Sequence, residues 1–158
     1  MRNASFKLII FITMILWIVS CSHKEIYFEY HSFTNSGWNN DNAAVFNVKI
    51  DDNSQPYDIS IELRNNGTYP FSNIWIFIDR KMPDGNILAD TIGAYLADDY
   101  GKWKGKGLNL YNISIPYKFS VLFPDKGMYT YSVRHGMQEN PLKGISDIGL
   151  KVSKKPNK

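Results

Sequence analysis

The sequence predicts an all-β domain, a single antiparallel β-sandwich of eight or nine strands. Apolar and polar residues alternate with a period of two in several short runs, as in Ile59, Ile61 and Leu63 with polar residues between them. Turn-forming residues separate these runs, and no long amphipathic helical pattern follows the N-terminal segment. Aromatic residues, typical of strands, make up 15% of the chain. The length and strand count favour a jelly-roll arrangement.

The first 20 residues have the form of a secretory signal peptide. Arg2 and Lys7 precede residues 8–19, LIIFITMILWIV, a run of twelve residues without a charge. Twelve helical residues span roughly 18 Å, well short of the ~30 Å hydrocarbon core of a bilayer. We therefore expect a removable leader and no permanent membrane span in this segment.

The end of the leader predicts a lipid anchor. Ile18-Val19-Ser20-Cys21 resembles a bacterial lipobox, in which the cysteine thiol receives a diacylglyceryl group and signal peptidase II cuts just before it. The alternatives are an ordinary signal peptide with a chance cysteine, or an uncleaved anchor. The expected organisation is a leader over 1–20, lipidated Cys21 with a short tether to residue 25, a sandwich over 26–152 and a basic tail over 153–158.

The net charge and the cysteine content indicate which partners are not expected and how the mature domain is stabilised. The formal charge is +3, and removing Arg2 and Lys7 leaves the mature chain at +1 (3 − 2). This gives no argument for a nucleic-acid partner or a polybasic membrane patch. Cys21 is the one cysteine, so the mature domain has no intramolecular disulfide and depends on its apolar core.

Turns are expected around 65–67, 83–86 and 124–127. The nine expected strands are, in chain order, 26–30, 46–50, 59–63, 73–79, 92–96, 108–115, 117–123, 129–133 and 148–152. The side chains expected in the core include Ile59, Ile61, Leu63, Ile76 and Val133. A short helix near residues 92–103 is the alternative to the fifth strand, but Gly93 and Gly101 disfavour it.

Segment 73–79 differs from the others because it is apolar on both faces. Ile74, Ile76 and Ile78 share one face, and Trp75 and Phe77 occupy the other. Such a strand is either central and covered on both sides, or it displays its aromatic side chains to something outside the domain. Trp75 and Phe77 are therefore candidate partner-binding residues.

The polar loop 98–107, DDYGKWKGKG, contains Tyr100 and Trp103. Two explanations remain open for large aromatic residues in such a loop. They fold back and plug the end of the sandwich, or they project as anchors, since tryptophan and tyrosine are enriched among interface hot spots. Tyr100 and Trp103 are thus further candidates for partner binding.

No catalytic or metal-binding motif is found in the sequence, and no cofactor is predicted. We expect His31 and His135 to be ordinary surface or strand-edge histidines. The paired acids Asp98-Asp99 fit a solvated turn, and the pair at 51–52 is interpreted in the same way. Half of a glycosidase carboxylate pair and a structural Ca²⁺ site are the alternatives for such acids.

Three short matches concern glycosylation. Asn66-Gly67-Thr68 and Asn112-Ile113-Ser114 fit the N-glycosylation sequon. In a bacterial lipoprotein there is little reason to expect that these sites are glycosylated. Asp90-Thr91-Ile92 resembles the acceptor sequence of the O-glycosylation systems of Bacteroidota. Thr91 is therefore a candidate O-glycosylation site.

Longer runs resemble the gliding-motility lipoprotein GldH family of Bacteroidota, and they cover nearly the whole mature chain. None of the shared motifs is catalytic. The runs are Gln55-Pro56-Tyr57, Leu63-Arg64-Asn65, Asn73-Ile74-Trp75-Ile76-Phe77-Ile78, Pro83-Asp84-Gly85, Tyr100-Gly101-Lys102-Trp103, Ile115-Pro116-Tyr117-Lys118 and His135-Gly136-Met137.

The resemblance implies a non-enzymatic, lipid-anchored envelope protein that supports gliding motility and the overlapping type IX secretion machinery. Its partners would be other envelope proteins of that machinery, with no nucleic acid and no small-molecule substrate. We expect the periplasmic face of the outer membrane, with the inner membrane as the alternative. A carbohydrate-binding envelope lipoprotein is the second hypothesis, because exposed aromatic side chains suit sugar stacking. A glycosidase is a third and is disfavoured by the missing acid–base pair.

Overall fold

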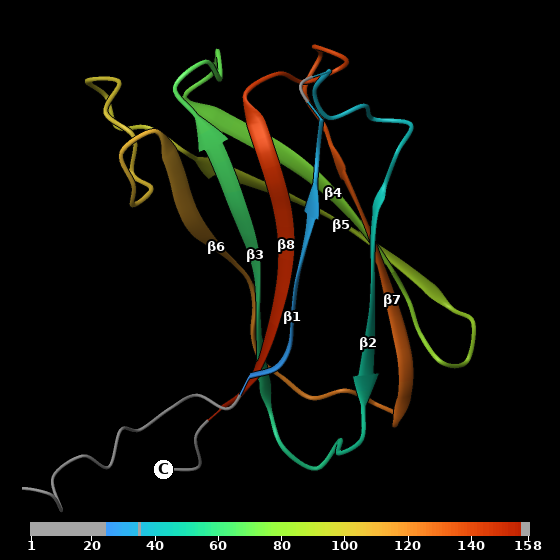
Figure 1. Ribbon diagram of the computed structural model, residues 1–158. Helices are drawn as coiled ribbons and strands as arrows, with labels where there is room; N and C mark the ends of the chain where they lie inside the picture. Colours follow the sequence, from blue (N-terminus) through green and yellow to red (C-terminus); the bar gives the residue numbers. More distant parts are fainter. Residues whose placement is uncertain (1–24, 35, 156–158) are drawn as a thin grey trace, which may run out of the picture.

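The computed structural model describes residues 25–34 and 36–155. The predicted signal peptide, Cys21 and the last three residues of the predicted basic tail lie outside the described residues. The described chain forms two facing β-sheets with loops at both ends of the sandwich (Figure 1). None of its segments is a helix long and apolar enough to cross a membrane.

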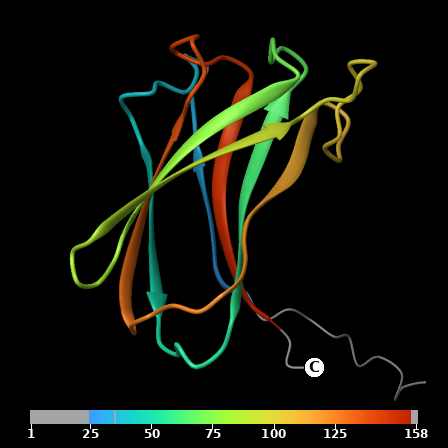
Figure 2. The same ribbon diagram turned by 180° about the vertical axis from the view of Figure 1, so that it is seen from behind.

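Eight strands make up the domain. The period-2 runs of the sequence produce them, and they are β1 (Glu25–Ser32), β2 (Ala44–Ile50), β3 (Tyr57–Asn66), β4 (Asn73–Lys81), β5 (Ile87–Tyr95), β6 (Leu110–Val121), β7 (Gly127–His135) and β8 (Ile145–Lys154). One sheet has the order β1-β8-β3-β6 and the other β2-β7-β4-β5, as the front and back views show (Figures 1 and 2). All pairings are antiparallel. This strand order is that of a jelly roll, so the predicted fold class is confirmed.

The core lies between the two sheets and consists of the inward members of each alternating run. The five side chains expected inside are all at most 1% exposed: Ile59, Ile61, Leu63, Ile76 and Val133. Strands β2 and β7 contribute further alternating inward residues, among them Phe46, Tyr129 and Tyr131. The segment near residues 92–96 is strand β5 followed by a loop, so the alternative of a short helix is excluded.

The prediction of separate strands over 108–115 and 117–123 is wrong, because both belong to β6. The register of β6 against β3 shifts twice opposite Tyr57–Ser60, and Ser120 has a φ of 52°. These irregularities break the period of two near the end of the strand. As a result Tyr117 faces the core while Phe119, two residues later, is 73% exposed.

The prediction of a surface or strand-edge position is also wrong for His135. This side chain is fully buried, and its Nε2–H donates to the carbonyl of Trp38, 3.1 Å away. Its ring meets the Trp38 ring edge-on, with 5.2 Å between centroids. Burial lowers the pKa of His135, because it disfavours the charged form. His31 is exposed, as expected.

The two ends of the sandwich are distinct. Strand β1 begins where Glu25 pairs with Ser153, next to the Asp58–Ser153 pair, and the described C-terminus leaves at the same end. We call this the N-terminal end; it is the lower end in Figure 1. The loops 33–43, 67–72 and 136–144 lie at the opposite, distal end, and the loop 96–109 projects near it.

We expect Ile61→Ala to lower the free energy of unfolding by about 2–5 kcal/mol, because it leaves a cavity in the centre of the core. Val45→Ala is the matched control, since Val45 is 49% exposed and should cost less than about 0.5 kcal/mol. Denaturant unfolding of both variants measures the difference. A loss below half a kcal/mol for Ile61→Ala would contradict this core assignment.

Candidate functional site: an aromatic platform on the outer face of β4 and β5

The aromatic side chains of β4 lie on the solvent side of its sheet. Ile74, Ile76 and Ile78 are fully buried, and the period of two turns the residues between them outward. Trp75 is 49% exposed and Phe77 is 38% exposed. Strand β4 is central in its sheet, but no third layer covers this face in the described part of the chain. Of the two possibilities for this segment, the structure therefore shows the uncovered one.

Two glycines hold the aromatic rings against the sheet. Gly93 is the cross-strand partner of Trp75, and a Cβ atom on it would lie 2.8 Å from Cζ3 of the indole. A Cβ atom on Gly136 would lie 2.9 Å from the ring of Phe77. Both rings thus lie on exposed backbone where any other residue would push them away. In the isolated chain both rings are already packed against the sheet.

Tyr95, on the same outer face, extends this surface to the end of β5 and is 70% exposed. Trp75, Phe77 and Tyr95 together are called the aromatic platform below. The ring of Tyr95 lies 5.5 Å from Nζ of Lys104, within range of a cation–π contact. The platform is therefore continuous with the lysine-containing loop 96–109.

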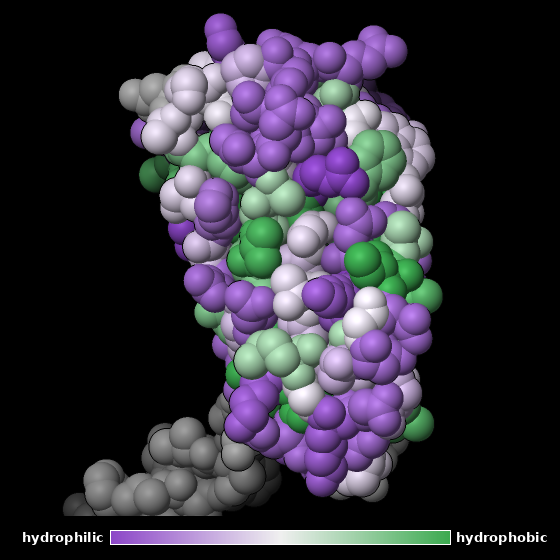
Figure 3. Space-filling view, turned by 90° about the vertical axis from the view of Figure 1, so that its right-hand side faces the viewer, coloured by the Kyte–Doolittle hydropathy of each residue, from purple (hydrophilic) through white to green (hydrophobic). Residues whose placement is uncertain are grey.

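The border of the platform is polar. Arg134, opposite Phe77 on β7, forms an ion pair of 3.1 Å with Asp79. The backbone N–H of Trp75 donates to Sδ of Met137 at 3.4 Å. On the side of the molecule that bears β2 and β7, apolar residues are likewise bordered by polar ones (Figure 3). Both ends of the sandwich are hydrophilic in the same view.

The two aromatic residues of the loop 96–109 have different environments. Tyr100 is 96% exposed at the tip of a turn. Trp103 is partly buried and packs against the core, with ring centroids 6.3 Å from Tyr69 and 5.8 Å from Tyr111. The structure thus brings Trp75 and Phe77 together on one face, while Tyr100 and Trp103 lie in the loop and differ from each other in exposure.

The paired acids lie in turns. Oδ1 of Asp98 accepts the backbone N–H groups of Tyr100 and Lys102 at 3.0 and 2.9 Å. Asp52 accepts bonds from Ser54, which lower the pKa of its carboxyl to about 2. Among the described residues, no group of three or more histidine, cysteine, aspartate or glutamate side chains has the arrangement of a metal site.

The Asp90-Thr91 pair splits across the two faces of β5. Asp90 points inward, accepts a 2.5 Å hydrogen bond from the hydroxyl of Tyr117 and lies 3.3 Å from Nζ of Lys118. The Tyr117 bond is the main cause that lowers the pKa of Asp90. Thr91 is exposed on the outer face, opposite Phe77. Its hydroxyl is therefore accessible beside the aromatic platform.

Sequence reasoning missed a polar network on the outer face of the other sheet. Glu62 is only 4% exposed, and its Oε1 accepts the hydroxyls of Ser60 and Ser114 at 2.6 Å each. Nζ of Lys151 lies 3.3 Å from the same oxygen. The signal in the sequence was only the polar phase of β3, which predicts a solvated face. Burial arises because side chains from three strands converge on Glu62.

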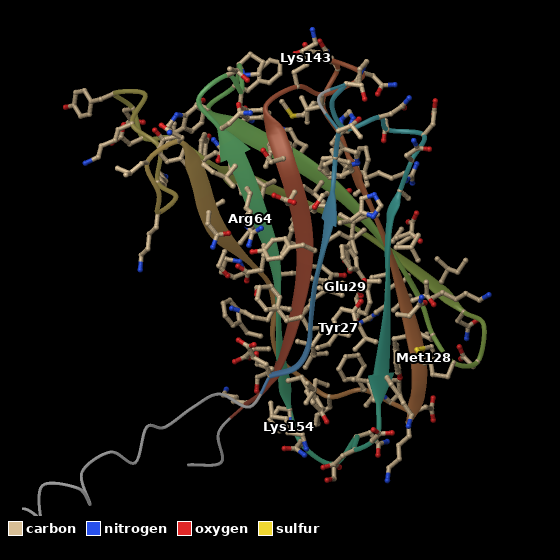
Figure 4. All side chains as sticks on the ribbon, in the orientation of Figure 1. Tyr27, Glu29, Arg64, Met128, Lys143 and Lys154 are labelled. Atoms are coloured by element: carbon tan, nitrogen blue, oxygen red, sulfur yellow. The ribbon has the colours of Figure 1, made fainter. Side chains whose placement is uncertain are left out.

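The same face carries a stacked arginine. The guanidinium of Arg64 lies 3.9 Å from the centroid of the Tyr30 ring and 3.7 Å from Oδ2 of Asp147. The labelled Arg64 lies on this sheet in Figure 4, while Lys143 and Lys154 mark the distal and N-terminal ends. A hollow of about 320 Å³ adjoins the Glu62 network and is lined in part by Phe119. Because Glu62 already bonds to neighbouring side chains, we interpret this network as structural.

Comparison with known proteins decides the family. The model of the GldH lipoprotein family matches residues 25–152, from the first residue of β1 into β8. The chain belongs to the GldH lipoprotein family. The resemblance seen in the sequence is thus confirmed, and it covers the whole sandwich.

Two curated GldH relatives are similar over most of their length. The "Gliding motility lipoprotein GldH homolog" of Christiangramia forsetii is 32% identical over 165 aligned positions, which cover 99% of this chain and 100% of that protein. The "Gliding motility lipoprotein GldH" of Flavobacterium johnsoniae is 28% identical over 146 positions, covering 87% of this chain and 90% of that protein. Membership in a lipoprotein family implies a lipid-anchored protein of the cell envelope.

The two loop aromatics of this GldH family member should respond differently to truncation. We expect Trp103→Ala to lower the free energy of unfolding by about 2 kcal/mol, because Trp103 packs on the core. Tyr100→Ala, the matched control in the same loop, should cost less than about 0.5 kcal/mol. Thermal denaturation of both variants measures this. Equal melting temperatures for the two variants would contradict a stabilising role for the packing of Trp103 against the core.

Proposed function

We propose that this protein is a non-catalytic, lipid-anchored module that supports the gliding-motility and type IX secretion machinery through protein–protein contact. The single observation that carries the proposal is the aromatic platform. Its side chains are large and exposed, and the rings of Trp75 and Phe77 pack against Gly93 and Gly136. Aromatic anchors with little conformational freedom to lose are typical of interface hot spots.

Family membership supports the cellular context of this proposal. The Flavobacterium johnsoniae relative is described as a gliding motility lipoprotein, and this chain aligns with 90% of its length. We extend that context to this chain. The partners are then other envelope proteins of the same machinery, and the favoured location is the periplasmic face of the outer membrane.

Lipidation at Cys21 would determine which end of the domain faces the membrane. Three residues separate Cys21 from Glu25, the first residue of β1, and the four Cα–Cα steps between these two positions reach at most about 14 Å when extended. The N-terminal end of the sandwich would then lie next to the bilayer. Strand β3, ten residues long, spans about 30 Å, so the distal end and its loops would project away from the membrane.

We expect Cys21→Ala to abolish lipid attachment and to leave an uncleaved precursor, because the thiol is the acceptor of the lipid. Two or more acyl chains make such attachment stable. Metabolic labelling with a fatty-acid analogue and the apparent mass of the protein in its own cells measure the effect. Cys21→Ala with normal labelling and processing would rule out this anchor.

Replacing both Trp75 and Phe77 by alanine should abolish gliding or secretion while the domain stays folded. Both side chains are partly exposed on the outer face, so their loss leaves no cavity in the core, whereas hot-spot truncation costs ≥ 2 kcal/mol of binding, roughly thirtyfold in affinity. Colony spreading and the amount of secreted protein are the measurements, in cells that produce the variant at the normal level.

Phe119→Ala is the matched control for this double variant. Phe119 is 73% exposed but lies on the other sheet, so its loss should leave gliding and secretion intact. If the platform variant behaves like Phe119→Ala, the aromatic platform is not the working surface.

Carbohydrate binding is the second candidate, and one observation favours it. The rings of Trp75 and Phe77 lie against glycine backbone, which leaves their outer faces open for a flat sugar ring to stack on. A glycan array probed with the purified domain separates the two functions. Specific binding that is lost in Trp75→Ala would support a carbohydrate partner. An array without specific binding would instead favour protein–protein contact as the function.

A further inference from the structure

Within the described residues, strand β5 presents a free edge with unused backbone hydrogen-bonding groups. Antiparallel pairs alternate between hydrogen-bonded and non-hydrogen-bonded positions. The backbone bonds Met82 N–H to Asn86 C=O and Leu96 N–H to Ser72 C=O belong to the hydrogen-bonded positions of the β4–β5 ladder. The even-numbered residues of β5 therefore bond to β4. The odd-numbered residues direct both backbone groups to the edge: Ile87, Ala89, Thr91, Gly93 and Tyr95.

The other three edge strands of the described chain are protected. Lys106 forms two backbone bonds with Asn112 and covers part of β6, which also contains Pro116. Strands β1 and β2 face each other across the sandwich, and β1 carries a bulge between Glu25 and Tyr27. Strand β5 keeps one register over nine consecutive pairs and contains no proline or lysine. Asp90, its one charged residue, is held inward by Tyr117.

We propose that β5 accepts an extended segment of a partner polypeptide as a fifth strand of the sheet β2-β7-β4-β5. This inference rests on the proposed function, because it specifies how the partner reaches the aromatic platform. Main-chain hydrogen bonds to the five odd-numbered residues provide affinity, and alternate side chains provide specificity.

The two faces of β5 indicate which types of side chain the partner segment carries. Partner residues on the outer face lie beside Thr91 and Gly93, where the ring of Trp75 borders the space that Gly93 leaves. Partner residues on the inner face cover Leu88, which is 44% exposed, and half-buried Ile92. The segment is therefore apolar on both faces, with β-branched or aromatic residues at alternating positions.

The positive charge of the loop after β5 predicts acidic residues in the partner segment. Lys102, Lys104 and Lys106 are exposed in the loop that follows β5, and they form no ion pair within the described residues. Nζ of Lys104 is 5.5 Å from the ring centroid of Tyr95, at the end of the free edge. Aspartate or glutamate in the partner, where its segment passes Tyr95, complements these lysines.

A second copy of this chain does not fit the edge. Two identical edge strands that pair about a twofold axis run antiparallel, and this rotation turns one copy upside down relative to the other. With Cys21 as the lipid-bearing residue, the inverted copy would have to bridge the roughly 30 Å length of the sandwich to reach the same membrane. The three residues between its Cys21 and Glu25 let the chain reach only about 14 Å.

The test uses the full-length lipoprotein in its own cells, with a photo-crosslinking amino acid in place of Ala89 on the free edge. The matched control carries the same amino acid in place of Val45, on the outer face of β2 at the opposite edge of the sheet. Each version is combined with Thr91→Pro or Thr91→Ala. Proline removes one outward N–H and is tolerated at a free edge, whereas alanine keeps that N–H and removes only the side chain.

We expect a crosslinked species from position 89 and none from position 45, at a mass other than twice that of this chain. Thr91→Pro should reduce its yield about tenfold, because one backbone bond is lost and its partner group stays unpaired, while Thr91→Ala should not. Lys104→Glu should reduce the yield as well. Should Thr91→Pro lower the melting temperature, Thr91→Lys replaces it, since a lysine side chain at the edge obstructs pairing without changing the backbone.

Three results would overturn the proposal: no crosslink from position 89, a crosslink at twice the mass of this chain, or a yield that the edge variants do not change. The last result, together with crosslinking at Trp75 and lost gliding in the platform variant, would leave the proposed function intact and reject only the added strand.

Discussion

The alternation of side chains along β4, in a fold of only two layers, is the constraint on which the rest of the structure depends. Ile74, Ile76 and Ile78 are fully buried because β4 crosses the centre of its sheet. A strand has two faces, so Trp75 and Phe77 must point to solvent. Burying them instead would expose the three isoleucines, at roughly 1.5–3 kcal/mol each. The fold therefore maintains a partly exposed aromatic surface on the outer face of this sheet.

The sequence was sufficient where a residue's neighbours along the chain determine its environment. The alternation in β3 predicted that Ile59, Ile61 and Leu63 are buried, and this is confirmed because these residues face the opposite sheet. An antiparallel sandwich of eight or nine strands followed from such runs and the turn residues between them. The predicted two-sided character of β4 was also correct, although the sequence left open whether its aromatic face was covered.

The sequence was insufficient where contacts between distant segments decide the outcome. Phe119 continues an apolar run but is exposed, because register shifts against β3 change the phase of β6. His135 is buried because the loop with Trp38 folds over it. Glu62 is polar by pattern yet buried, since neighbouring strands supply Ser114 and Lys151. The role of Gly93 became clear only from its pairing with Trp75, since an isolated glycine in a strand has several explanations.

The most direct test is hydroxyl-radical footprinting of Trp75 in intact cells and in the purified domain. Trp75 is 49% exposed in the isolated chain, so its oxidation rate should fall in the envelope if a partner covers the aromatic platform. Phe119, exposed on the other sheet, is the internal reference and should oxidise at the same rate in both samples. A Trp75 rate that relative to Phe119 is equal in cells and in solution would contradict the central claim that this surface is occupied in the cell.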